Sequence, residues 1–233
     1  RVWITQVRFD EPDVSPLAIQ GPKAEDLMAR VFGETVRAIR FFRCGVYQFE
    51  GRDLVVARSG YSKQGGFEIY VEGSDIGMPL WHRLFEAGAD LEVRAGCPNL
   101  IERIESGLLS YGNDMTDDNT PHECGLGRFC NTHTAIGCIG RDALLRVAKE
   151  GPVQQIRPIA IAGDAVPPCD RFWPLYANGR RVGRVSSATW SPDHATNVAI
   201  GMVKMTHWDA GTQVEVETPD GMRPATVREN FWN

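Results

Sequence analysis

The chain has 233 residues, of which 42% are hydrophobic and 24% are charged, and its formal net charge is −5. That length suits one large domain or two small ones. The negative net charge argues against nucleic-acid binding driven by counterion release. No apolar run approaches the roughly 20 residues that span a bilayer. We therefore expect neither a nucleic-acid partner nor a membrane segment.

The start of the chain is unusual, because it opens at Arg1 rather than at a methionine. The opening residues alternate like a strand and lack the apolar stretch of a signal peptide. We expect the 233 residues to be part of a longer protein.

Six cysteines stand at positions 44, 97, 124, 130, 138 and 169, and no two of them have CxxC spacing. Their density is low for a disulfide-stapled domain. Cys124 and Cys130 lie near His122 and His133, but the short ligand pairs that hold tetrahedral zinc are missing. We predict reduced thiols, a cytoplasmic location and no metal site.

The first part of the chain predicts an antiparallel sheet with flanking helices. Alternating apolar residues predict a strand over 2–9, which Pro12 and Pro16 break. Gly51 is expected to turn a hairpin between strands 39–49 and 54–58, followed by a strand over 67–72. Helices are predicted over 23–32, 75–87, 98–109 and 141–149, with a loop over 110–138.

The character of the sequence changes at Pro152. Short strands are predicted from there on, over 156–162, 172–176, 182–187, 198–205, 214–218 and 225–229. Asn178-Gly179 and Asp220-Gly221 are hairpin turn signals. The predicted fold class is α+β, with an antiparallel sheet and flanking helices over 1–150 and a small all-β, barrel-like domain over 151–233.

The first segment that could carry chemistry runs over 59–70. Gly65 and Gly66 precede the strand there, so a ligand could approach the backbone. Glu68 and Tyr70 share one face of that strand, because side chains alternate. A carboxylate beside a phenol ring suits a flat heterocycle rich in hydrogen-bond donors. The alternative is an ordinary hairpin whose exposed face carries Glu and Tyr.

Two further segments are weaker candidates. Glu102 and Arg103 lie on a predicted helix, where they serve anionic or polar groups of a ligand or simply pair with neighbours along the helix. The hydroxyl residues around Trp190, over 183–192, either line a pocket rim or form a strand that runs into a turn. The five histidines show no ligand spacing and predict structural or surface roles.

Four segments in this order, GYSKQGGFEIYVEG, GLLSYGNDMTDDNTPHECGLGRF, GRDALL and GRVSSATWSP, resemble the aminomethyltransferase (glycine-cleavage T-protein) superfamily. The family's counterparts would read roughly YTGEDGFE, RLEAGLxLYG and GxVTSGTxSP. The runs SKQGGFEIY and GCPNLIERIESGLLSYGND, with the late His207-Trp208, resemble its tetrahydrofolate-dependent dimethylsulfoniopropionate demethylase branch. The resemblance spans nearly the whole chain.

The resemblance implies a folate site. Glu68 looks like the family's pterin-binding Glu, and Tyr70 matches a Tyr of the demethylase branch that also lies at the folate. Tyr61 stands where the family keeps an aromatic ring before that Glu. Arg103 matches the Arg of RLEAGL, toward the more polar end of folate, and Tyr111 matches the Tyr of LYG. No catalytic residue is assigned.

The implied activity is methyl transfer from a sulfonium, such as dimethylsulfoniopropionate, to N5 of tetrahydrofolate. The partner is then a small-molecule methyl donor, and the enzyme mainly has to align sulfur, methyl and nitrogen. An N-terminal segment absent from this chain, or a second chain, is expected to supply most of the small-substrate pocket, so the 233 residues alone are not expected to be fully active. The alternatives are a T-protein-like aminomethyltransferase and a folate-binding protein without catalysis.

Overall fold

The computed structural model describes residues 10–132 and 137–232, so the strand predicted over 2–9 lies outside the described residues. The chain divides into two compact units, Arg1–Pro98 and Asn99–Asn233. This division falls earlier in the chain than the predicted domain boundary after residue 150, which stays a prediction. The predicted fold class, a mixed helix and sheet part followed by a β-barrel, is confirmed.

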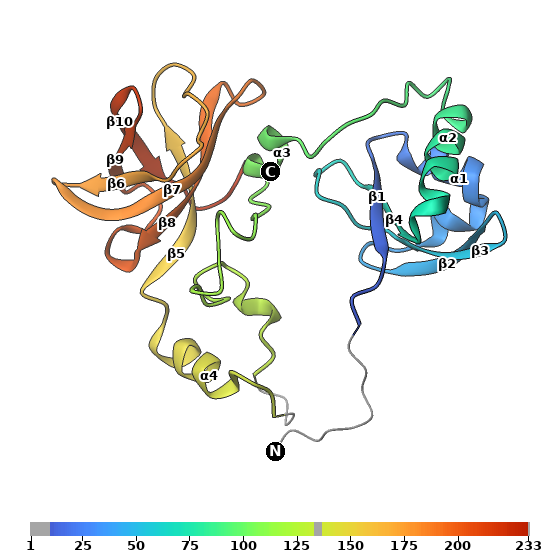
Figure 1. Cartoon of the computed structure of the whole chain (residues 1–233). Helices are drawn as coiled ribbons and strands as arrows, with labels where there is room; N and C mark the ends of the chain where they lie inside the picture. Colours follow the sequence, from blue (N-terminus) through green and yellow to red (C-terminus); the bar gives the residue numbers. More distant parts are fainter. Residues whose placement is uncertain (1–9, 133–136, 233) are drawn as a thin grey trace. The chain divides into compact units, whose positions relative to one another are not determined.

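A four-stranded antiparallel sheet forms the first unit, with the strand order β1-β4-β3-β2 (Figure 1). The strands are β1 (Val14–Gln20), β2 (Cys44–Phe49), β3 (Arg52–Ala57) and β4 (Gly66–Glu72). Glu50 and Gly51 both have positive φ and turn β2 into β3, which confirms the predicted hairpin.

Strand β1 corrects the sequence prediction, which placed a break at Pro12 and Pro16 and no strand after them. Pro16 lies inside β1, opposite Tyr70 of β4. A proline lacks the N–H that a central strand needs on one of its sides. β1 tolerates it because β1 lies at the edge of the sheet and pairs with β4 alone.

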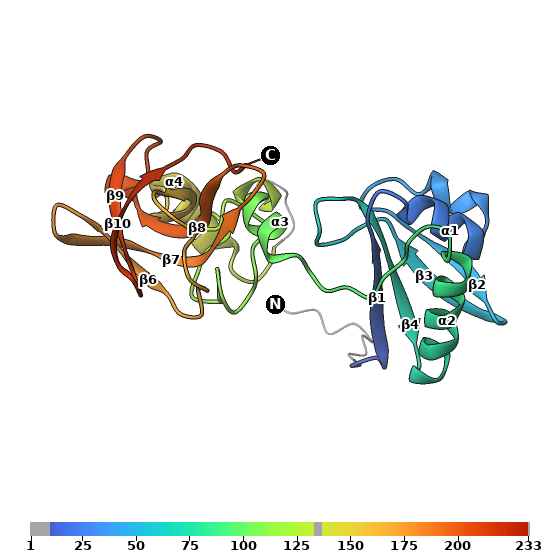
Figure 2. The same ribbon diagram turned by 90° about the horizontal axis from the view of Figure 1, so that it is seen from above.

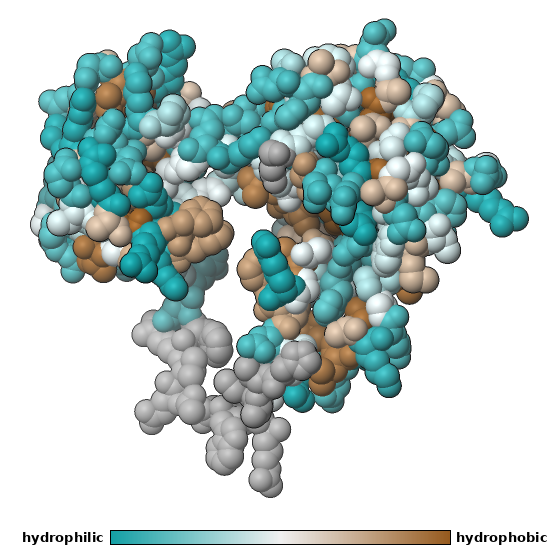
Figure 3. Space-filling view, turned by 180° about the vertical axis from the view of Figure 1, so that it is seen from behind, coloured by the Kyte–Doolittle hydropathy of each residue, from teal (hydrophilic) through white to brown (hydrophobic). Residues whose placement is uncertain are grey.

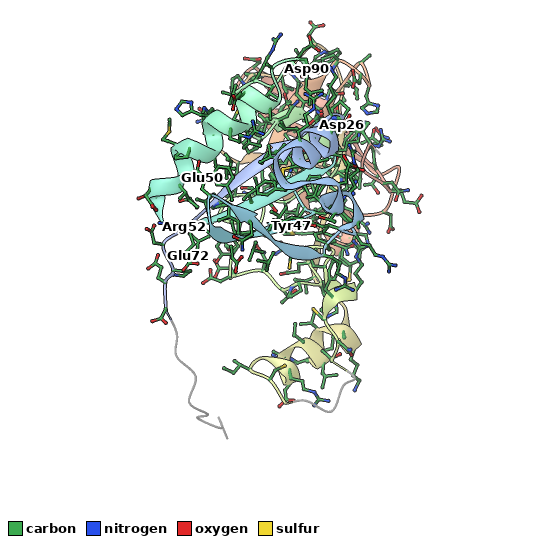
Figure 4. All side chains as sticks on the ribbon, turned by 90° about the vertical axis from the view of Figure 1, so that its right-hand side faces the viewer. Asp26, Tyr47, Glu50, Arg52, Glu72 and Asp90 are labelled. Atoms are coloured by element: carbon green, nitrogen blue, oxygen red, sulfur yellow. The ribbon has the colours of Figure 1, made fainter. Side chains whose placement is uncertain are left out.

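Two helices cover one face of this sheet (Figure 4). They are α1 (Ala24–Phe32) and α2 (Gly77–Ala87), and both are confirmed. The short 3₁₀ turns η1 (Glu34–Ala38) and η2 (Ser74–Ile76) accompany them. Met28 of α1 and Leu80 of α2 are fully buried against Phe67 and Ile69 of β4. Over residues 10–98, no helix of this unit covers the opposite face of the sheet.

Exposed ion pairs join the elements of this unit. Arg37 reaches Asp26 of α1 at 2.9 Å. Arg30 of α1 makes a two-point contact with Asp90, just after α2. The hydrogen bonds from Arg30 lower the pKa of Asp90 to about 2. This pair ties the two helices together over the sheet.

A closed six-stranded antiparallel barrel forms most of the second unit, in the order β10-β5-β8-β7-β6-β9. Its strands are β5 (Gln154–Ile161), β6 (Trp173–Ala177), β7 (Arg180–Ser191), β8 (Thr196–Lys204), β9 (Gln213–Thr218) and β10 (Gly221–Val227). Asn178 and Gly179 turn β6 into β7 at positive φ, as predicted. Figure 2 shows the barrel strands curving around a common interior, which Trp173 and Leu175 fill.

Shorter elements complete the second unit. α3 (Leu100–Glu105), the 3₁₀ turn η3 (Gly127–Phe129) and α4 (Arg141–Glu150) precede the barrel. The 3₁₀ turn η4 (Met205–His207) follows β8. α3 is shorter than the predicted helix over 98–109. It begins after Asn99, whose side chain accepts a hydrogen bond from Ile101 N at 3.0 Å. It ends before Gly107, which has a φ of +66°.

The surface mixes hydrophilic and hydrophobic residues, as Figure 3 shows for one face. Among the residues that the structure describes, none forms a helix of the length and apolar character needed to cross a membrane.

Candidate functional site

The uncovered face of the first unit's sheet carries Glu68 and Tyr70. Both side chains point away from the helices, because Phe67, Ile69 and Val71 alternate with them and are buried. The strand register places Ala18 of β1 and Ala57 of β3 on either side of Glu68. The prediction that Glu68 and Tyr70 share one face is confirmed by this register.

Glu68 is half-buried and accepts a short hydrogen bond from the hydroxyl of Ser59. Ser59 lies just beyond the end of β3. Directly opposite side chains on neighbouring strands lie about 5 Å apart. The alanines at both neighbouring positions are too short to cover the Glu68 carboxylate, so it stays accessible from the open side of the sheet.

Tyr70 belongs to a row of apolar side chains that crosses the sheet next to Glu68. Its cross-strand neighbours are Pro16 on one side and Val55 on the other, and Val46 follows Val55. Tyr70 is 39% exposed, Val55 42% and Val46 63%. A carboxylate beside an exposed apolar strip can bind a planar ring that has donors along one edge.

Tyr61 lies in the segment over 59–65, which joins β3 to β4 without regular structure. Gln20, the last residue of β1, reaches this segment. Its amide nitrogen donates to the carbonyl oxygens of Ser59 and Phe67, both at 3.1 Å. Its amide oxygen accepts from the Ser62 hydroxyl at 2.7 Å. The loop that carries Tyr61 is therefore tied to the sheet edge.

Arg103 belongs to the second unit, on α3, and is buried. Its guanidinium pairs with Asp114 at 2.6 Å and donates to the Leu108 carbonyl at 2.9 Å and to the Ser187 hydroxyl at 2.6 Å. In the described structure this arginine joins α3 to the following loop and to β7. Contact of Arg103 with a cofactor stays a prediction.

Asp114 is fully buried at the centre of this network. One of its oxygens accepts from the hydroxyls of Ser186 and Ser187, each at 2.7 Å. The other accepts from Arg103 and from the backbone N–H of Ser110 at 2.8 Å. Four donors fill the acceptor positions of a carboxylate. That saturation makes a buried charge tolerable.

A bulge in β7 explains how two successive serines reach one carboxylate. Val185 pairs with Gly201 and Ser187 with Ile200, so Ser186 is an extra residue in the strand. In a regular strand, neighbouring side chains point to opposite faces. The bulge breaks that alternation at Ser186 and turns both hydroxyls toward Asp114.

The alternative that the segment over 183–192 lines a pocket rim stays a prediction for the half-buried Thr189 and Trp190, and the serines do not take part in the surface. Ser186, Ser187 and Ser191 are all buried, and Ser191 donates to Glu105 at 2.6 Å. The other alternative, a strand running into a turn, is confirmed, since β7 spans this segment. Arg103 does not form a surface pair with a neighbour along the helix, because it is buried and binds Asp114 of the following loop.

Tyr111 is 70% exposed and lies in the loop after α3. Gly112 N donates to Met115 O at 2.8 Å across the turn that carries it. The predicted residues thus fall into two groups, with Glu68, Tyr70 and Tyr61 on the first unit and Arg103 and Tyr111 on the second.

Sequence reasoning missed several polar residues that the structure brings to these groups. Ser59 and Gln20 stand beside Glu68, and Asp114 holds Arg103. Gln20 had no signal beyond being a polar residue next to Gly21. Asp114 lies in the run that carries the family resemblance, and a buried partner for Arg103 could have been sought there.

Two shallow pockets of the first unit lie elsewhere. One is lined by Arg40, Arg43 and Tyr47, among others, and the other by Asp13, Arg52 and Glu72 (Figure 4). Within residues 10–132 and 137–232, no three histidine, cysteine, aspartate or glutamate side chains gather as metal ligands. His133 lies outside the described residues.

The described structure combines a helix-covered four-stranded sheet with a closed six-stranded barrel, and family models match both parts of the chain. The model of the GCVT N-terminal domain matches residues 2–134, and the model of the glycine cleavage T-protein C-terminal barrel domain matches residues 156–231. The chain belongs to this family, as its sequence resemblance implied.

The chain is similar to proteins of two named activities. The dimethylsulfoniopropionate demethylase DmdA of Ruegeria pomeroyi is 67% identical over 97% of this chain. An aminomethyltransferase of Caldanaerobacter subterraneus is 31% identical over 99% of it. The chain spans 61% and 62% of the lengths of these two relatives.

A solved structure has the same fold. The crystal structure of the glycine cleavage system aminomethyltransferase T from Bartonella henselae matches with a TM-score of 0.78 at 25% sequence identity. The match covers 94% of this chain and 60% of that one.

Proposed function

We propose that the protein containing this chain is a tetrahydrofolate-dependent methyltransferase that demethylates a sulfonium such as dimethylsulfoniopropionate. The 67% identity to the Ruegeria pomeroyi demethylase carries the proposal. The family resemblance and the open Glu68–Tyr70 face support it. Because the chain spans only 61% of that relative, the activity is proposed for the complete protein.

The residues of the open sheet face fit a pterin ring. An ionised carboxylate has about four acceptor positions, and Ser59 fills one of those on Glu68. The amino group and ring N–H of a pterin donate along one edge, which matches this carboxylate. Ala18 and Ala57 leave room beside it, and the Tyr70 ring offers an apolar surface. We propose that these residues bind the ring.

Tyr61, Arg103 and Tyr111 complete the proposed set of cofactor-binding residues by resemblance. Tyr61 would add a second aromatic ring near the pterin. Tyr111 is exposed and able to contact a ligand, whereas Arg103 is engaged by Asp114. A folate contact with Arg103 therefore requires a polar group of folate to reach the Arg103 guanidinium while Asp114 stays bound to it.

Tetrahydrofolate supplies the methyl acceptor, its N5 nitrogen. The residues of this chain bind and orient its ring, and such alignment can lower a barrier by several kcal/mol. A sulfonium already carries an activated leaving group, so a strong base is less needed than in aminomethyl transfer. Exposed aromatic side chains can also attract a cation, at about 0.5–2 kcal/mol per contact.

The small-molecule methyl donor is the proposed partner, and a preceding segment or second chain is proposed to complete its pocket. The six cysteines are free in the structure, which supports the proposal of a cytoplasmic protein. The negative charge gives no support to a nucleic-acid partner.

One substitution tests the pterin assignment. Glu68→Ala is expected to weaken tetrahydrofolate binding by about 1–3 kcal/mol, because buried ring donors lose a charged partner. Isothermal titration calorimetry on the natural polypeptide that carries this chain measures the change. Glu72→Ala is the matched control, since it changes an exposed glutamate of the same strand. Equal affinity in the Glu68 variant and the parent contradicts the assignment.

A turnover assay separates the proposal from its alternatives. With tetrahydrofolate and dimethylsulfoniopropionate, the expected products are 5-methyltetrahydrofolate and methylthiopropionate. Turnover of an aminomethyl-lipoyl donor alone identifies an aminomethyltransferase, as the 31% identical relative is named. Folate binding without turnover of either donor identifies a folate-binding protein.

A further inference from the structure

The segment over 59–65 carries Ser59 and Tyr61, two residues of the proposed folate site. Ser59 donates to Glu68 at its start, and Tyr61 follows two residues later. The segment has no helix or strand of its own. Irregular segments hold one conformation only where side chains or backbone groups fix them.

Gln20 is placed to fix this segment. It pairs with Gly66 across the β1–β4 ladder and lies on the same face as Glu68. Its side chain reaches over β4 to the carbonyl of Ser59, at 3.1 Å. Both amide hydrogens are used, since the second binds Phe67 O, and the amide oxygen accepts from Ser62. One side chain therefore contacts both ends of the turn that carries Tyr61.

Two glycines make room for this side chain. A Cβ on Gly60 would lie 2.1 Å from the Gln20 amide oxygen, far inside contact distance. A Cβ on Gly66 would lie 2.2 Å from the Ile19 carbonyl oxygen and 3.0 Å from Cδ of Gln20. Close packing against the Gln20 side chain thus explains Gly60, and close packing against the backbone of β1 and the base of the same side chain explains Gly66.

We infer that Gln20 is a positioning residue of the proposed folate site, which holds Ser59 on Glu68 and sets the place of Tyr61. The inference rests on the proposed function. Gln20 acts through Ser59. Its hydrogen bond fixes the Ser59 carbonyl and so restricts the orientation of the Ser59 side chain. The Ser59 hydroxyl in turn orients the Glu68 carboxylate. A mobile segment would lose both the Ser59 hydrogen bond and a defined ring position.

The test compares tetrahydrofolate affinity by calorimetry in variants of the natural polypeptide that carries this chain. Gln20→Met keeps the length of the side chain and removes its hydrogen bonds. We expect its dissociation constant to rise about fivefold to tenfold. Gln48→Met is the control, because Gln48 is an exposed glutamine on β2 of the same sheet.

A double-mutant cycle distinguishes positioning from a general structural role. If Gln20 acts through Ser59 and Glu68, Gln20→Met costs less affinity once Glu68 is already alanine. A residue that only stabilises the fold would show the same loss in both backgrounds. A second pair of variants tests the close packing of Gly60 against Gln20. Gly60→Ala should lower the melting temperature less in a Gln20→Ala background than in the parent, because the amide that clashes with the added Cβ is then absent.

Affinity within twofold of the parent in folded Gln20→Met, while Glu68→Ala binds weakly, overturns the inference and leaves the proposed function standing. Unchanged affinity in Glu68→Ala overturns the proposed folate site itself, and with it the inference about Gln20. If Gln20→Met does not fold, Ser62→Ala decides, since it removes one of the three contacts. Weaker binding at an unchanged melting temperature supports the inference, and unchanged binding overturns it.

Discussion

At the scale of single residues, Asp114 is the buried carboxylate on which the Arg103 network depends. It is fully buried, carries a charge and touches four donors from three separate segments. Each donor compensates part of the cost of taking the carboxylate out of water. Arg103 depends on it equally, because the buried guanidinium needs a counter-charge.

Asp114→Ala is expected to lower the free energy of unfolding by about 3–5 kcal/mol, because it leaves Arg103 buried without its partner. Urea unfolding followed by tryptophan fluorescence measures the loss. Asp117→Ala changes an exposed aspartate of the same loop and should stay close to the parent. Parent-like stability in the Asp114 variant would mean that the network contributes little.

Cys169 illustrates a second effect of burial on one residue. It packs against the barrel core, and burial raises the pKa of its thiol to about 12. The folded protein therefore holds this proton more tightly than the unfolded chain. The contribution to stability is complete below the unfolded pKa of 9.0 and is lost as the pH rises from there toward about 12.

We expect Cys169 to resist alkylation by iodoacetamide at pH 8, while Cys44, Cys97 and Cys138 react because they are exposed. Mass spectrometry of peptides after timed labelling reads the order of reaction. Labelling of Cys169 as fast as Cys44 would contradict this expectation.

At the scale of elements, the close approach of β7 and β8 depends on Gly183. A Cβ there would lie 2.3 Å from the Met202 carbonyl oxygen and 3.1 Å from Cα of Val203. Both are backbone atoms of the paired strand, so a rotamer change cannot relieve the clash.

Gly183→Ala should therefore destabilise the barrel by about 1–3 kcal/mol, the range for overpacking. Thermal unfolding followed by circular dichroism measures the shift. Gly96→Ala is a suitable comparison, since nothing lies within 4 Å of its added Cβ. The expectation is wrong if both variants melt together.

Local signals predicted most elements well, and the misses have physical reasons. The β2–β3 hairpin, α1, α2 and the barrel strands follow from periodicity and turn residues, which act over a few positions. β1 was missed because a proline is acceptable only on an edge strand, and edge position is a property of the finished sheet. The predicted helix over 98–109 is too long, because Leu108 continues the helical spacing of apolar residues beyond Gly107, where the positive φ ends the helix.

At the scale of the whole molecule, each unit has a core of its own. One cluster, around Phe67, Ile69 and Leu80, lies in the first unit. The clusters around Trp173 and around Ile104 with Trp232 lie in the second. The second unit also contains every partner of the Asp114 network.

Residues 99–233, produced by themselves, are therefore expected to fold and to melt cooperatively. Near-UV circular dichroism follows the packing of Trp173 and Trp232 during the transition. A chain without a cooperative transition would show that the barrel core needs residues from outside this unit. Asp114→Ala in the same shortened chain should lower its midpoint.

The candidate site could be predicted only in part, for a reason of scale. Glu68 and Tyr70 follow from the alternation of one strand, which a sequence shows directly. Ser59, Gln20 and their hydrogen bonds depend on which strands become neighbours, since 39 residues separate Gln20 from Ser59. Arg103 was assigned by resemblance, whereas its buried partners come from a loop and a strand far along the chain.

The extra residue in β7 makes this strand sensitive to length in a way that its composition does not reveal. Replacing Ser186 removes one hydroxyl from Asp114. Deleting Ser186 would close the bulge, because Val185 and Ser187 would then be successive residues opposite Gly201 and Ile200 in a regular ladder. The pairing with β8 would be kept, but the local bend that brings two successive hydroxyls to Asp114 would be lost. Deletion of Ser186 should therefore be tolerated less than its replacement by alanine, which removes one hydroxyl and keeps the bend.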